Sequence, residues 1–160
     1  MALHKLILDD IEDVSYSLLA IHCTMEDFRV AYLLNKHLKI SLTRRPEDLD
    51  FACKKASFSL FEWKDEEKMI TWNLISNVCK VEEDGILNTE SLFKVPNKII
   101  RTHNLIPEYK RVNYFLKIFN DGNFINEKSI IANIQKIPHI VTVYSLDASQ
   151  LKSKDNLIFI

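Results

Sequence analysis

The chain has 160 residues, of which 47% are hydrophobic and 27% charged, with two glycines and four prolines. This length and composition are typical of one folded domain covering residues 1–160, and they exclude a chain that stays unfolded. Because 21 basic residues stand against 22 acidic residues, no net charge attracts nucleic acid or a membrane surface. The apolar runs are too short for a secretory leader or a membrane span, so we expect a cytoplasmic protein without membrane association.

Three cysteines, Cys23, Cys53 and Cys79, are odd in number and widely spaced along the chain. They form no CxxC pair, which argues against a disulfide framework and against a structural zinc site. We interpret them as small apolar side chains of the interior.

The first structural signals are a strand followed by a helix. Aliphatic and aromatic residues alternate with serines over residues 14–23, which predicts a core strand. Thr24 precedes two acidic residues at nearly the spacing of a helix cap, and apolar residues then recur at helical spacing, so a helix is predicted over residues 25–39. A short β-like run over residues 40–44 and a polar turn over residues 47–50 follow.

The next segment predicts an antiparallel hairpin. Its arms cover residues 52–63 and 68–80, and a charged loop at residues 64–67 joins them. Phe61 and Trp63 fall on the face opposite the other apolar residues of the first arm. We expect these two aromatic side chains to cover either a second layer or a partner.

The second half of the chain ends in another strand, helix and strand. Residues 82–104 lack periodicity and are predicted to be an irregular excursion over the core. Alternation over residues 112–118 predicts a strand that ends at the turn signal of residues 120–123. Asn126 is the expected N-cap of a helix with an isoleucine stripe, which Pro138 terminates. The remaining predictions are a strand at residues 140–144, a polar tail at 145–154 and a short final strand at 157–160.

This order of elements predicts an α+β fold. We expect a two-layer sandwich in which two helices cover one face of a mainly antiparallel sheet. A ferredoxin-like relative is one candidate topology, with a strand, helix and strand at each end of the chain.

The sequence contains no recognisable catalytic, metal or phosphate-binding pattern. His22 and Cys23 are adjacent, but neighbours on a strand point to opposite faces and do not form a dyad. The five histidines have no HxxxH or HExxH spacing, and the two glycines belong to no phosphate-binding loop. Acidic clusters fall in predicted loops, where solvated charge is the usual explanation. We therefore predict no catalytic residue, no metal and no cofactor.

Basic pairs next to aromatic residues give a faint indication of a surface for single-stranded RNA. The pairs are Arg44 with Arg45, Lys54 with Lys55, and Lys110 with Arg111, near Phe51, Tyr109 and Tyr114. No aromatic motif typical of RNA-binding domains accompanies them. A solvated rim is the favoured interpretation, and a nucleic-acid partner is not expected.

One segment resembles a known family. Residues 105–118, LIPEYKRVNYFLKI, resemble the signature of the IPExxxVDY family of small proteins from Bacteroidetes-type bacteria. The resemblance extends over nearly the whole chain, including residues 32–36 and 151–159. It implies a bacterial lineage and a cytoplasmic setting, and it implies no reaction. Asn113 stands where the family pattern has Asp, which keeps a hydrogen-bonding group but removes a carboxylate.

The motif supplies the candidate binding residues, which are Ile106, Pro107, Glu108, Val112, Asn113 and Tyr114. Pro107 fixes its own φ and biases Ile106 toward an extended conformation. Glu108 is expected to cap a turn, to accept backbone N–H groups, or to pair with Lys110 or Arg111. A structural role is favoured over binding, and binding over catalysis.

Three functional hypotheses remain. The preferred one is a non-catalytic protein-interaction or regulatory domain with an unknown protein partner or with self-association through a sheet edge, motivated by Phe61, Trp63 and Tyr109 near predicted surface edges. The alternative is a small-ligand-binding or enzymatic domain whose pocket lies between the Ile106-Pro107-Glu108 loop and the first helix, using Glu108, Tyr114 and Arg29. It requires a partly buried Glu108 with a polar partner, and an exposed Glu108 would contradict it. The third is binding of single-stranded RNA.

Overall fold

The computed structural model describes residues 16–51, 55–85 and 98–159. Within them, the α-helices are α1 (Asp27–Leu38) and α2 (Glu127–Gln135), and the short 3-10 helices include η3 (Pro107–Tyr109), η4 (Ala148–Gln150) and η5 (Lys154–Leu157). The strands are β1 (Tyr16–Cys23), β2 (Thr43–Arg44), β3 (Leu49–Phe51), β4 (Ala56–Phe58), β5 (Leu60–Asp65), β6 (Ile70–Ser76), β7 (Val78–Asp84), β8 (Lys98–Asn104), β9 (Tyr114–Phe119) and β10 (Ile140–Leu146). None of the helices in these segments is long and apolar enough to cross a membrane.

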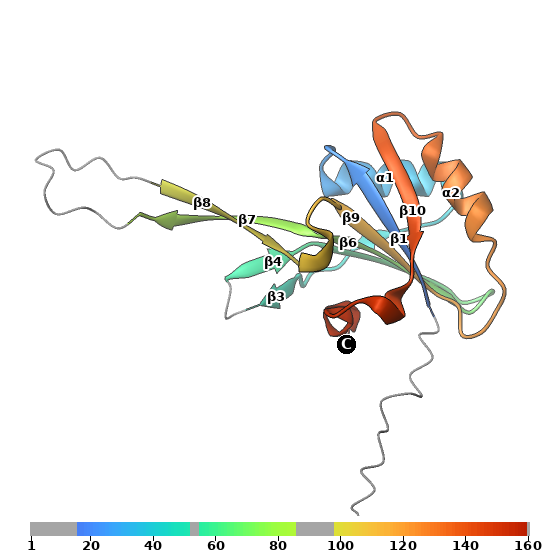
Figure 1. Ribbon diagram of the computed structural model, residues 1–160. Coiled ribbons are helices and arrows are strands. Elements are labelled where there is room, and N and C mark those ends of the chain that lie inside the picture. The colour runs from blue at the N-terminus through green and yellow to red at the C-terminus, as the bar shows by residue number, and fades with distance from the viewer. Residues whose placement is uncertain (1–15, 52–54, 86–97, 160) are drawn as a thin grey trace, which may run out of the picture.

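Six strands form one antiparallel sheet in the order β10-β1-β9-β6-β5-β2 (Figure 1). In its four strands β10-β1-β9-β6, α1 follows β1 and α2 joins β9 to β10, which is the β-α-β-β-α-β arrangement of ferredoxin-like folds. β5 and β2 extend the sheet at one edge. The predicted α+β class with a mainly antiparallel sheet is confirmed, and the ferredoxin-like topology applies to these four strands.

Both helices cover the same face of the sheet (Figure 1), because each carries an apolar stripe that has to be buried. Val30 and Leu34 of α1 and Ile134 of α2 belong to one buried cluster. The sheet contributes alternate residues to this cluster, among them Leu19, Ile21, Leu74, Leu116 and Ile118. The two predicted layers are thus packed through one continuous core.

Phe61 and Trp63 point to the face of the sheet that the two helices cover. Phe61 is buried, and Trp63 packs half-buried against the same cluster as the helices. Trp63 also lies directly opposite Trp72 on the neighbouring strand, where paired side chains share a face. These two aromatic side chains therefore belong to the core and do not form an exposed surface for a partner.

The opposite face of the sheet is buried as well. The β3–β4 hairpin, the loop before β9 and the C-terminal 3-10 helices lie over it (Figure 1). The buried cluster on this side includes Phe58 of β4, Ile106 of the loop, Phe115 of β9 and Leu157 of η5. As a result, residues 18–21 of β1 are all fully buried, and the central strands are covered on both faces.

The helix ends agree with the predictions in one case and differ in the other. Asn126 caps α2 as predicted, since its side-chain oxygen accepts a hydrogen bond of 3.1 Å from a backbone N–H in the first turn. Thr24 does not cap α1. The N-cap is Glu26, without a side-chain cap hydrogen bond, so this helix begins at Asp27 and not at Met25.

Several strand predictions are wrong in detail. Residues 47–50 were expected to form a polar turn, but β3 begins within them and pairs with β4. Each predicted hairpin arm consists of two strands, because Ser59 and Asn77 interrupt them and let β4 and β7 leave the sheet. The final strand predicted at residues 157–160 is also wrong for residues 157–159, because Leu157 ends η5 and buries its side chain in the second cluster, and Ile160 lies outside the described residues.

β7 and β8 form a separate two-stranded ribbon that projects from the body of the protein (Figure 1). The prediction of irregular chain over residues 82–104 is therefore wrong for residues 82–84 and 98–104. Most of these side chains are exposed, so they lack the buried face that gives a strand its alternating pattern. Residues 86–97 lie outside the described part of the chain.

Two of the cysteines can be compared with the prediction. Cys23 is a buried free thiol in the helix-face cluster, and Cys79 is a half-buried free thiol at the base of the ribbon. Cys53 lies outside the described residues. Burial raises the pKa of the Cys23 thiol, which makes it a poor nucleophile.

Candidate functional site

The motif residues form a loop that leads from the ribbon back into the sheet. Leu105 and Ile106 are buried, Pro107 opens η3, and Val112 returns to the interior just before β9. Ile106 has an extended conformation, with φ −116° and ψ 93°, as expected for a residue before proline. The loop therefore presents residues 107–111 at the surface between two buried anchors.

Asn77 holds this loop in shape. It lies between β6 and β7 with no exposed surface. Its side-chain Nδ2 donates to the carbonyl oxygens of Tyr109 at 2.9 Å and Val112 at 2.8 Å, and its Oδ1 accepts from the Ile106 N–H at 2.8 Å. Both donors and the acceptor are satisfied, as a buried amide requires. Sequence analysis missed Asn77, whose only signal is a polar residue that interrupts the β-pattern.

Asn113 joins the loop to β1. Its Oδ1 accepts a hydrogen bond of 3.0 Å from the Cys23 N–H, where the pairing of β1 with β10 shifts register. Its backbone N–H donates to the Ile21 oxygen, and its backbone oxygen accepts from the Asn77 N–H. An acceptor is what this position needs, and an Asn supplies it as well as an Asp does.

Tyr114 faces the helices and not the surface of the loop. Its hydroxyl donates to the Met25 carbonyl oxygen at 2.6 Å, which ties β9 to the start of α1. Burial is the main reason that the pKa of Tyr114 is raised far above its ordinary value, and nearby ionisable groups of β1 and α1 add to the effect. The hydroxyl therefore remains a hydrogen-bond donor at neutral pH.

Raising the pH above about 10 is expected to destabilise the fold through Tyr114. The folded protein keeps the hydroxyl proton that the unfolded chain releases near that pH, so this stabilisation is complete below pH ~10 and is lost as the pH rises further. Urea unfolding at a series of pH values between about 8 and 11 measures the effect. The Tyr114→Phe variant should show a flatter decline, and an equal decline in both proteins would contradict the assignment.

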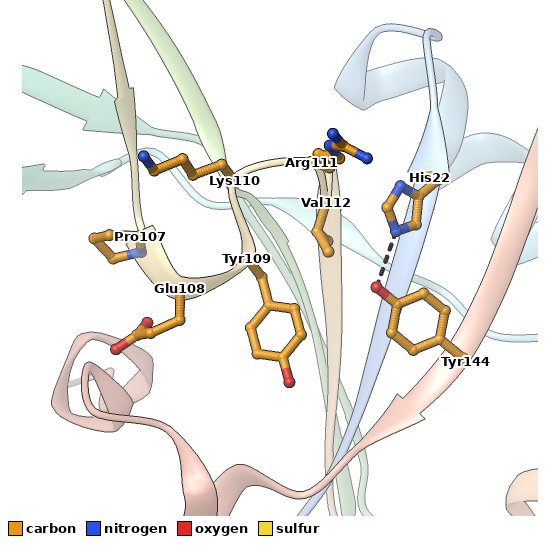
Figure 2. Close-up of a pocket in the computed structure, with 8 residues that line it drawn as sticks. All are labelled: His22, Pro107, Glu108, Tyr109, Lys110, Arg111, Val112 and Tyr144. Carbon is orange, nitrogen blue, oxygen red and sulfur yellow. Dashed lines mark hydrogen bonds between the residues drawn. The ribbon is translucent and has the colours of Figure 1, made fainter.

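Glu108 is exposed and turned toward the C-terminal turns (Figure 2), where its Oε1 accepts a hydrogen bond of 3.0 Å from the Ser153 hydroxyl. Slight desolvation acts to raise the pKa of this carboxyl. Hydrogen bonds from backbone N–H groups and from Ser153 outweigh it, so the pKa of Glu108 lies below its ordinary value. Its structural partner is thus the turn before η5. Neither Lys110 nor Arg111 pairs with Glu108 in the described residues.

A pocket that combines Glu108, Tyr114 and Arg29 is contradicted by these positions. Arg29 lies on α1 beside a different cavity of about 490 Å³, whose other lining residues are Thr24, Met25, Glu26, Phe28 and His139. Tyr114 faces that helix, whereas Glu108 lies on the other side of the sheet. The expectation fails because the loop covers the face of the sheet opposite the helices.

The loop does line an open pocket of about 360 Å³ together with β1 and β10 (Figure 2). The lining residues are His22, Pro107, Glu108, Tyr109, Lys110, Arg111, Val112 and Tyr144. Of the six candidate binding residues, Pro107, Glu108 and Val112 contribute to the pocket, whereas Ile106, Asn113 and Tyr114 do not. Sequence analysis did not assign His22 or Tyr144 to this site.

His22 and Tyr144 form a hydrogen-bonded pair in the pocket. The His22 Nε2 lies 3.0 Å from the Tyr144 hydroxyl, and the two rings are 5.5 Å apart at 31° (Figure 2). Burial, together with the proximity of Tyr109, raises the pKa of Tyr144, so its hydroxyl stays protonated at neutral pH. Cys23 points to the opposite face, as predicted.

The rim of the pocket is positively charged. Lys110 and Arg111 are exposed and take part in no ion pair within the described residues. Glu108, the acidic lining residue, is directed to Ser153. The lining of this pocket therefore carries two cations, Lys110 and Arg111, and one carboxylate, Glu108.

The other basic pairs give little support to an RNA surface. Arg44 forms an ion pair with Asp48, and Arg45 forms one with Glu62, so this pair is largely neutralised. One residue of the second pair, Lys54, lies outside the described residues. In the described segments, no three His, Cys, Asp or Glu side chains are grouped to hold a metal ion.

Comparison of the chain with protein-family models, with curated proteins and with solved structures found no match. The resemblance of residues 105–118 to the IPExxxVDY family stays a prediction.

Proposed function

We propose that the chain is a non-catalytic regulatory domain that binds a small carboxylate with a flat apolar body in the pocket beside the motif loop. The observation that carries this proposal is the pair of cations, Lys110 and Arg111, without ion-pair partners in the described residues, at the rim of a pocket lined by Tyr109 and Tyr144. The IPExxxVDY lineage, which we retain as part of the proposal, adds no reaction to it.

The chemistry of the rim favours a carboxylate. A guanidinium matches the two oxygens of a carboxylate with parallel hydrogen bonds, and an ammonium adds a second positive charge. Tyr109 and Tyr144 both line the pocket, on opposite sides of it (Figure 2), so a planar group between them would contact two aromatic rings. A volume of about 360 Å³ is at the lower end of the range for small-ligand sites.

The residues around this pocket favour binding over catalysis. Glu108 is directed to Ser153, and His22 is bonded to Tyr144. The lining residues therefore lack both an activated nucleophile and a second carboxylate for acid and base work.

The test uses benzoate as the probe and uncharged benzamide as its matched control. Benzoate is expected to shift NMR signals of the pocket residues at millimolar concentration and to bind more tightly than benzamide. Replacing both Lys110 and Arg111 with alanine should weaken benzoate binding by about tenfold or more, because charge-assisted hydrogen bonds are lost. Lys136→Ala, an exposed lysine outside the pocket, should leave it unchanged. Equal binding of the two probes, or no loss in the double variant, would refute the proposal.

A further inference from the structure

Along β7, the β7–β8 ribbon has an edge whose outward backbone groups pair with no other strand in the described residues. The two strands pair from Val78 opposite Asn104 to Asp84 opposite Lys98, and neither belongs to the six-stranded sheet. A two-stranded ribbon alone is marginally stable in water. Its apolar side chains Ile99 and Ile100 are 48% and 63% exposed, so packing on the body of the protein does not account for its stability.

A hydrogen bond at the base of β7 shows which backbone groups of this strand face β8. The Leu105 N–H donates to the Asn77 carbonyl oxygen, so residue 77 faces the β8 side. Bonded and non-bonded positions alternate in an antiparallel pair. The N–H and C=O groups of the residues at positions 78, 80, 82 and 84 therefore point outward. In agreement, the Val78 oxygen accepts from the Ser76 hydroxyl at 3.0 Å and not from β8.

The edges of the six-stranded sheet are better protected. Along β10, the Gln135 side chain donates to the Val141 oxygen and accepts from the Val143 N–H, which occupies outward groups of that strand. At the opposite edge, β2 has only two residues. Among the described strands, β7 thus presents a long edge with free backbone groups. Proteins usually cover such an edge or pair it.

We propose that β7 pairs with β7 of a second copy of this chain, antiparallel and centred on Val81, to form a continuous four-stranded sheet. In this register Lys80 lies opposite Glu82 of the second copy, and the two-fold symmetry repeats the pair. Val81 lies opposite its own counterpart, and outward backbone groups meet outward backbone groups. Opposite charges directly across two strands stabilise the pairing.

The alternative registers are disfavoured by charge. Centring the pair on Glu82 places this carboxylate opposite itself, and centring it on Lys80 does the same with two ammonium groups. Pairing through β8 around its middle residue places Arg101 against Arg101. β4 contacts the base of β7, where the Ser57 N–H donates to the Cys79 sulfur at 3.5 Å, and Lys80, Val81 and Glu82 lie further along the strand.

Sedimentation of the full chain tests this proposal. The wild-type protein is expected to dimerise, and the single variants K80E and E82K should each raise the dimer dissociation constant by about tenfold or more, because like charges then lie opposite each other. An equimolar mixture of K80E and E82K should dimerise again, since each chain now complements the other. Lys98→Ala removes the ion pair between Lys98 and Glu82 within one chain and should leave the dimer intact.

The variant Val81→Cys tests the register of the pairing between the two copies of β7. Residues opposite each other at a non-bonded position have Cα atoms about 4.5 Å apart, which is within the range that a disulfide spans. Mild oxidation should therefore cross-link this variant, but neither the wild type nor Thr102→Cys on the outer strand. A monomeric wild type, single variants that dimerise normally, or a mixture that stays monomeric would each overturn the proposal. Absence of the cross-link in a dimer would overturn the register.

Discussion

Replacing Asn77 with alanine is expected to lower the free energy of unfolding by roughly 3–5 kcal/mol. The side chain has no exposed surface and makes hydrogen bonds of 2.8–2.9 Å to three backbone groups of the motif loop. Alanine leaves those buried groups without a partner and leaves a small cavity. Urea denaturation measured by circular dichroism gives the change directly.

Two further variants make this result specific. Asn77→Asp keeps the shape and the acceptor but loses both donated hydrogen bonds, so it should destabilise the protein about as much as alanine does. Asn104→Ala removes only long hydrogen bonds of 3.3 and 3.4 Å from a half-exposed side chain and should cost about 1 kcal/mol or less. If Asn77→Ala were no more destabilising than Asn104→Ala, the amide would not organise the loop.

Replacing Phe115 with alanine is expected to destabilise the protein by roughly 3–5 kcal/mol. Phe115 is fully buried on the face of the sheet opposite the helices, under the motif loop and the C-terminal turns. Phe119, in the same strand and 37% exposed, is the matched control, and its replacement should cost about 1 kcal/mol. Thermal unfolding of both variants makes the comparison. Similar small losses would mean that the second face is not a packed core.

Local patterns in the sequence predicted the elements that bury one regular face. β1, α2 and β10 were recognised because their apolar residues recur at strand or helix spacing. The Asn126 cap was recognised because Asn126 and the N–H that it binds lie within one helical turn. The β7–β8 ribbon was missed because strands with few buried side chains lack that alternation. The C-terminal turns were missed because single anchors such as Leu157 have no period.

The candidate site was only partly accessible to sequence analysis. The motif pointed to the loop, and Lys110 with Arg111 was recognised as a basic pair near Tyr109. The pocket also needs His22 and Tyr144, which hydrogen-bond across 122 positions of the chain. Asn77 reaches its partners across 29 to 35 positions. No local spacing relates residues that are so far apart.

The sequence by itself determined an α+β fold with two amphipathic helices and a mainly antiparallel sheet, and that Pro107 turns an extended segment into a surface loop. Hydrophobic periodicity and backbone preferences are properties of a few neighbouring residues, so they are readable from the chain. Only the tertiary structure decided that the second face of the sheet is covered, that Asn77 shapes the loop, and that β7 keeps an open edge. These features depend on which distant segments of the chain pack together. Local sequence patterns are compatible with many such arrangements, and only the packing of the whole chain selects one of them.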